Sequence, residues 1–148
     1  MTKKITLRIL KAKGACKSQC ERFAALFPKG VEVTEALCIK HAADFNWNWG
    51  ARNLLRASAW AEYERAQASA WAKYQRATAP AWVEYERAKA PASAEYKRAY
   101  ERATASDWAK YERVEAPAWA EYERVKDSAL AEYKRAKASV FAKIYLEG

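Results

Sequence analysis

Most of the chain repeats one pattern of apolar and polar positions every eleven residues. From Ser58 the units read SAWAEYERAQA, SAWAKYQRATA and PAWVEYERAKA, with Trp, Tyr and Arg at fixed places. Seven units are complete, the fourth carries four additional residues, and a partial unit follows them. A fixed period over more than half of a chain is the strongest signal a sequence offers, and here it indicates a helical repeat array.

The period of eleven places the aromatic residues on one side of a helix. Eleven residues at about 100° each make about three turns plus 20°, so each repeat position returns to nearly the same face. Trp60 and Tyr63 then share one face, and Glu62 and Arg65 lie opposite. The pattern predicts an amphipathic helix of the hendecad type. Its charge pairs are worth only about 0.2–0.5 kcal/mol each and are interpreted as a solvated surface.

Three prolines leave two architectures open for the array. Pro80, Pro91 and Pro117 occupy the first repeat position, where other units have Ser, and both residues favour the start of a helix. The array is therefore either a solenoid of short helices or a long helix, curved by kinks at Pro with its aromatics on the concave side. The absence of Gly between repeats favours the long helix. A break near 99–106, at the insertion, would give two antiparallel halves.

The residues before the array have a different pattern. Ile5, Leu7 and Ile9 alternate with other residues and predict one short strand. Residues 15–27 predict a helix, 28–30 a turn, 34–43 a second helix and 46–48 a loop or cap. We therefore divide the chain into a head, residues 1–57, and an array, residues 58–148. The expected fold class is mainly α, with a small helical head that includes at most one strand.

Charge separates the two parts. The net charge is +9, and the head contributes most of it, with eleven basic and four acidic residues. The array holds sixteen basic and fourteen acidic residues and is nearly balanced. A basic cluster in the head could neutralise phosphates, so non-specific nucleic-acid binding is kept as an alternative function. Its members are Lys3, Lys4, Arg8, Lys11, Lys13 and Lys17.

The cysteines and the single histidine offer a weak metal-site candidate. Cys16 and Cys20, with Cys38 and His41, have spacings that put each pair on one helix face and together form a ligand set that zinc accepts. The favoured interpretation is core packing, because a C-x2-C pair is missing and buried cysteines behave as small apolar groups. No arrangement typical of a catalytic site is found, so neither an enzyme nor a cofactor is expected.

The chain has no feature of a membrane or secreted protein. It contains no run of 18 apolar residues, and its basic start, in which apolar residues alternate, does not predict a signal peptide. Its three cysteines are typical of a reducing compartment, so a cytoplasmic location is expected.

The head and the array together resemble uncharacterised phage and prophage proteins. The similarity rests on Ala15-Cys16 through Phe23, on Phe27-Pro28, on 31–34 and on 53–55, followed by A-E-Y-E-R-type repeats from Ala61. This resemblance implies a bacteriophage or bacterial-cytoplasm origin, and it supplies no catalytic residues.

The aromatic face is the main functional candidate. A single amphipathic helix cannot cover its own apolar face, so the array must pack on itself or on a partner. We expect self-association, binding of a host protein such as a defence protein that it would inhibit, or both; a structural filament or virion assembly is the alternative. The residues of this face are Trp60, Tyr63, Trp71, Tyr74, Trp82, Tyr85, Trp108, Tyr111, Trp119 and Tyr122.

Overall fold

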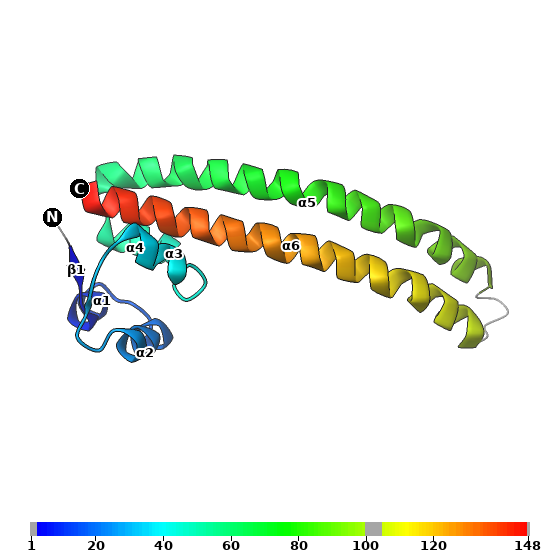
Figure 1. The fold of residues 1–148 in the computed structure, drawn as a ribbon, viewed down its shortest axis with the longest axis horizontal. Helices are drawn as coiled ribbons and strands as arrows, with labels where there is room; N and C mark the ends of the chain where they lie inside the picture. Colours follow the sequence, from blue (N-terminus) through cyan, green and yellow to red (C-terminus); the bar gives the residue numbers. More distant parts are fainter. Residues whose placement is uncertain (1–2, 100–104, 148) are drawn as a thin grey trace. The chain divides into compact units, whose positions relative to one another are not determined.

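The computed structural model describes residues 3–99 and 105–147, and over these ranges the fold is mainly α, as the sequence predicts (Figure 1). The described residues form six helices and one pair of short strands. The chain divides into two compact units, each described by itself below. Unit 1 contains residues 1–72 and 131–148, and unit 2 contains residues 73–130.

The start of unit 1 corrects the expected strand. Strand β1 (Lys4–Ile5) pairs antiparallel with β2 (Val31–Glu32), but the chain then turns into helix α1 (Leu7–Ala12). The strand predicted across Leu7 and Ile9 is therefore wrong beyond Ile5. The Thr6 hydroxyl accepts a hydrogen bond from the Ile9 amide and caps the helix, which buries Leu10. The alternation of apolar residues from Ile5 to Ile9 predicts a strand, but the Thr6 cap starts a helix there instead.

The remaining head helices follow the sequence more closely. Helix α2 (Lys17–Leu26) and the turn before β2 confirm the prediction for 15–30, with Gly30 at a φ of 77°. Helix α3 (Glu35–Lys40) begins after a Thr34 cap, as expected, but ends earlier than predicted. Helix α4 (Trp47–Leu54) is an additional element, and the expected cap at Asn46 is its N-cap.

The core of unit 1 forms where these short helices meet the ends of two long ones. Phe141 is 2% exposed and contacts Trp47, with the two ring centroids 5.4 Å apart. Polar contacts add to this packing, because Ser139 Oγ donates to Glu35 Oε1 at 2.6 Å and Lys3 Nζ donates to the Tyr145 carbonyl at 2.7 Å. The head therefore packs against the helical ends of the array.

The array forms two long helices, and this contradicts the solenoid of short helices. Helix α5 spans Ala57–Ala99 and continues through Pro80 and Pro91, and α6 spans Ala105–Glu147 and continues through Pro117. All three prolines are exposed, so the helix carbonyl that each leaves without an amide partner lies on the solvent side. The expected break at the insertion falls between the two helices, and residues 100–104 lie outside the described residues.

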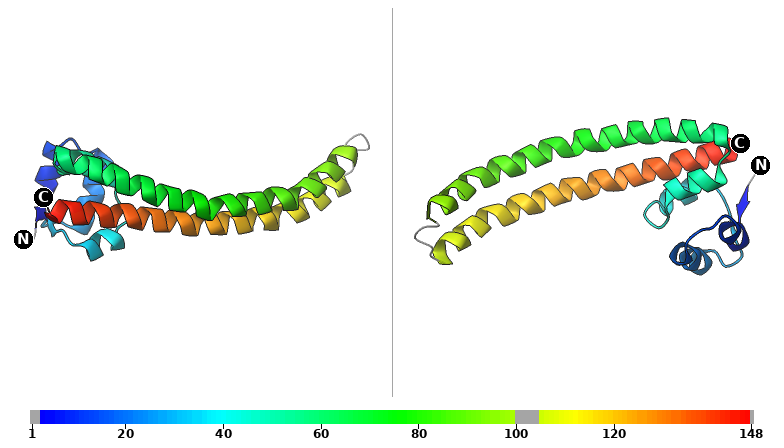
Figure 2. Two further views of the ribbon diagram at one scale, coloured as in Figure 1. Left: turned by 90° about the horizontal axis from the view of Figure 1, so that it is seen from above. Right: turned by 180° about the vertical axis from the view of Figure 1, so that it is seen from behind.

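The two helices of unit 2 pair antiparallel in a constant register. Facing rings lie 5.1 Å apart for Trp82–Tyr122, 5.2 Å for Tyr85–Trp119 and 5.3 Å for Tyr96–Trp108. The residue numbers of each pair add to the same total, which is the mark of an antiparallel pairing. Figure 2 shows from two further sides that α5 and α6 run side by side here. Unit 1 contains one such pair in the same register, Trp71–Tyr133, at 5.2 Å.

Candidate functional site

Four aromatic rings form the centre of unit 2. Trp82 and Tyr85 on α5 meet Trp119 and Tyr122 on α6, and each Trp packs edge-on against the Tyr of the facing helix. The two tyrosines lie 6.0 Å apart between the helices. Edge-to-face ring pairs at such distances contribute about 0.5–1.5 kcal/mol beyond area burial. The repeat therefore uses Tyr at the helix contact and Trp beside it.

The antiparallel register brings the tryptophans of both helices to one face. Two facing antiparallel helices with the same repeat are related by an approximate two-fold axis perpendicular to the plane that contains them. Such an axis keeps a residue on the same side of the pair, so Trp82, Trp108 and Trp119 all lie on one face of unit 2. We call these three residues and the tyrosines that they contact the tryptophan face.

The tryptophan face is only partly covered. Trp82, Trp108 and Trp119 are 44%, 47% and 42% exposed. Among the described residues of unit 2, only Tyr85 and Ala129 are buried. Two helices cover each other along one contact alone, and alanine at most flanking positions buries little area. The unit thus leaves large apolar side chains in water, a feature common at interaction surfaces.

Charged groups border this face. Lys89 lies over the Tyr85 ring at 5.3 Å, and Lys126 lies over Trp119 at 5.9 Å and over Tyr122 at 5.6 Å. The Tyr85 hydroxyl donates to Glu115 Oε1 at 3.0 Å, and burial together with this carboxylate raises the pKa of Tyr85. An aromatic centre with a charged rim is the usual anatomy of a protein interface.

Two charge pairs of the repeat lie in solvent. Arg87 pairs with Glu84 at 2.8 Å and Arg124 with Glu121 at 2.6 Å, and all four side chains are well exposed. The Arg124 guanidinium lowers the pKa of Glu121. Exposed pairs of this kind contribute little to stability. They agree with the solvated surface that the sequence predicts.

In unit 1 the same repeat positions enter the core. Tyr63 is fully buried and donates its hydroxyl proton to Asn48 Oδ1 at 3.0 Å, and burial strongly raises its pKa. Trp60 stacks on Tyr63 at 5.7 Å and has the Arg52 guanidinium 5.3 Å above its ring. Trp71 stays 42% exposed. Of the other expected face residues, Tyr74 and Tyr111 are half-buried in unit 2.

The structure does not assemble the zinc ligand set. Cys20 and Cys38 are buried and Cys16 is exposed, with all three thiols free. His41 Nδ1 instead contacts Asp44 Oδ2 at 2.7 Å. Among the described residues, no group of three or more His, Cys, Asp or Glu side chains is placed to hold a metal ion. Burial raises the pKa of the Cys38 thiol to about 11, as expected for a cysteine packed in a core.

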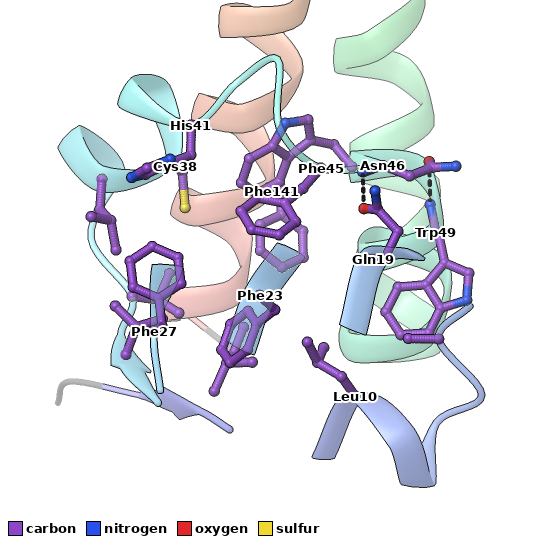
Figure 3. Close-up of a pocket in the computed structure, with 17 residues that line it drawn as sticks. Leu10, Gln19, Phe23, Phe27, Cys38, His41, Phe45, Asn46, Trp49 and Phe141 are labelled. Atoms are coloured by element: carbon purple, nitrogen blue, oxygen red, sulfur yellow. Dashed lines mark hydrogen bonds between the residues drawn. The ribbon is translucent and has the colours of Figure 1, made fainter. Parts of the chain in front are cut away.

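Unit 1 contains an apolar cavity that the sequence pattern does not predict. It has a volume of about 90 Å³, and its walls come from all four head helices and from α6 (Figure 3). Rings of Phe23, Phe27, Phe45, Trp49 and Phe141 surround it, together with Leu10 and Cys38. The sequence signal was the spacing of Cys20, Phe23 and Phe27 on one helix face. That spacing predicts a core but not the space that the core encloses.

The basic cluster of the head remains partly available. Lys3 is engaged with Tyr145, through its carbonyl at 2.7 Å and its ring at 5.4 Å. Lys17 lies 3.8 Å from Glu21 in an exposed pair. The exposed members of the cluster are Lys4, Arg8, Lys11, Lys13 and Lys17.

None of the described helices combines the length and the apolarity that crossing a bilayer requires. Comparisons of the chain with protein-family models, with curated proteins and with solved structures give no match.

Proposed function

We propose that this chain is a non-enzymatic helical-repeat interaction protein whose tryptophan face binds protein, and that its first partner is a second copy of the chain. One observation carries the proposal: three tryptophans on one face of unit 2 are 42% to 47% exposed, over a unit with only two buried residues among those described. Tryptophan is enriched among the residues that dominate binding energy, because it buries a large area with few rotatable bonds.

A second copy suits this face for two reasons. The face has approximate two-fold symmetry already, and an isologous dimer requires a surface that is complementary to itself. Two pairs of helices would together form a four-helix arrangement, in which each helix is covered on a second side. The Lys and Glu residues at the border supply charges of both signs to the rim, as with Lys89 and Glu115.

Light scattering over a range of concentrations tests the proposal. We expect the wild-type chain, of 16.9 kDa, to form a discrete oligomer that dissociates on dilution. The double variant Trp82→Ser/Trp119→Ser should be monomeric. A second variant, Ser93→Glu, places a charge at the Trp position of the fourth repeat without removing a ring, and it should also be monomeric. Circular dichroism would confirm that both variants keep their helices.

The matched control is Val83→Ser. Val83 is 52% exposed and follows Trp82, but it lies at a repeat position turned away from the contact between the helices. Its loss should leave the oligomer unchanged. A wild-type chain that stays monomeric at several hundred micromolar would contradict self-association, and so would equal weakening by Val83→Ser and by the tryptophan variants.

The resemblance to phage proteins suggests a second partner. In that setting the same face would bind a host protein, such as a defence protein that it inhibits, in the cytoplasm of the bacterial cell. The free cysteines suit that compartment. If the particle mass in the same scattering experiment increases with concentration without reaching a limit, that result would instead support a filament or virion assembly.

Nucleic-acid binding is the second candidate function, supported by the exposed basic residues of the head. Fluorescence anisotropy with a labelled duplex tests it at two salt concentrations. Binding through phosphates should weaken steeply as salt rises, and substitution of Lys11 and Lys13 by Gln should reduce the slope. Absence of binding at low salt would exclude it.

A further inference from the structure

The cavity of unit 1 is bounded by side chains that the fold brings together from distant parts of the sequence. Leu10, Phe23, Cys38 and Phe141 are between 2% and 7% exposed, and each comes from a different helix. Protein interiors pack closely and contain few voids larger than a water molecule. A cavity of about 90 Å³ is therefore a notable feature of so small a core.

The polar side chains around the cavity already have partners. Gln19 Oε1 accepts from the Asn46 amide at 3.0 Å, and the Trp47 indole donates to the Ala42 carbonyl at 2.9 Å. No buried side-chain nitrogen or oxygen of the described residues lacks a hydrogen bond. A buried water needs two to four polar partners, and this lining offers few. The chemistry of the walls thus favours an apolar occupant.

Size and shape restrict that occupant further. Engineered apolar cavities of about 150 Å³ take up benzene or xenon. The present cavity, at about 90 Å³, is smaller but open to solvent on one side, so a single ring fits with one edge in that opening and two fused rings do not fit. Its walls are mostly rings, and Figure 3 shows Phe23, Phe27, Phe141 and Trp49 arranged around the space. Aromatic walls favour a flat ring through edge-to-face contacts. Phe27, His41 and Phe45 are only half-buried, which provides a path from solvent.

We propose that this cavity is a binding site for a small uncharged apolar molecule no larger than a single aromatic ring. The site lies entirely within unit 1 and does not depend on the tryptophan face. A ligand that binds only the folded chain stabilises it by mass action, so occupancy would raise the thermal stability of the head.

Thermal unfolding of the full chain with benzene as the probe tests the proposal. The midpoint should rise with benzene concentration and then saturate. Naphthalene, which is too large, should give no saturable rise. An equal response to both probes, or no response to benzene, would overturn the proposal.

A matched pair of variants locates the site. Ala15 lines the cavity and Ala24 does not, although both are half-buried. Ala15→Leu fills part of the space and should abolish the benzene response, and Ala24→Leu should retain it. If Ala15→Leu fails to fold, methyl NMR of the wild-type chain replaces it. Benzene should then shift the methyl signals of Leu10, Val33 and Leu37, which line the cavity, and leave those of Leu130 unchanged. The reverse pattern would place benzene on the helices of unit 2 and overturn the inference.

Discussion

Units 1 and 2 use the same eleven-residue repeat and obtain different interiors from it. In unit 1, fourteen buried residues form a single cluster, and Ala138 and Ala142 within α6 are fully buried. In unit 2, the described residues include two that are buried, and comparable alanines such as Ala120 are exposed. The repeats of the two units are similar in sequence, so the difference in burial comes from what surrounds them. In unit 1 the head covers a second side of the helices. Burial in a repeat helix is thus set by how many layers cover it.

The largest test of this contrast removes one ring from each unit. Phe141→Ala should reduce the free energy of unfolding by about 3–5 kcal/mol, since it leaves a cavity beside Trp47. Tyr122→Ala, in dilute monomeric protein, should cost less, about 1–2 kcal/mol, because Tyr122 is only half-buried although it loses its edge-to-face contact with Trp82.

Urea denaturation measures both losses. The milder Phe141→Leu serves as a reference if Phe141→Ala does not fold, with an expected cost of about 1 kcal/mol. Equal losses for Phe141→Ala and Tyr122→Ala would show that unit 2 is as well packed as unit 1, and the contrast would fail.

A smaller test compares two tyrosine hydroxyls. Tyr63→Phe removes the donor to the half-buried Asn48 from a fully buried tyrosine and should cost about 1 kcal/mol. Tyr85→Phe removes the donor to Glu115, a half-buried carboxylate that water can reach, and should cost about 0.5 kcal/mol, the low end for a hydrogen bond. The difference in urea midpoint between the two variants is the measurement. A larger loss at Tyr85 would reverse the ranking of the units.

The smallest expected effect is the pH dependence that Asp44 contributes in unit 1. The Arg22 guanidinium and then His41 hold the pKa of Asp44 below its ordinary value of 3.8. Because the folded pKa is lowered, this contribution to stability is present above pH 4 and is lost as the pH falls through the lowered pKa.

The variant Asp44→Asn should remove that dependence. Its cost at pH 7 should be under about 1 kcal/mol, because the Arg22 side chain is 55% exposed and solvent screens the pair. Chemical denaturation at pH 3 and pH 7 would show a smaller difference for the variant than for the wild type. An unchanged pH dependence would mean that other carboxylates produce it.

Several features of the candidate sites could be predicted from the sequence, and others could not. The shared face of Trp82 and Tyr85 followed from repeat spacing, since helix geometry fixes that angle. The helix over residues 7–12 did not, because Ile5, Leu7 and Ile9 fit a strand equally well until the Thr6 cap is considered. The different environments of Cys16, which is exposed, and Cys38, which is buried, could not be predicted. They depend on which side of each helix packs against the core.

The sequence by itself determined the hendecad helices, the common face of their aromatic residues and the balanced charge of the array. All three follow from local periodicity, which the backbone geometry of one helix converts into a surface. The tertiary structure alone decided that Tyr63 is buried while Trp82 remains exposed, and that the head helices and α6 together surround an apolar cavity. It also showed that α5 continues through Pro80 and Pro91. Burial and enclosed space depend on which segments meet, and those contacts join residues far apart in the chain.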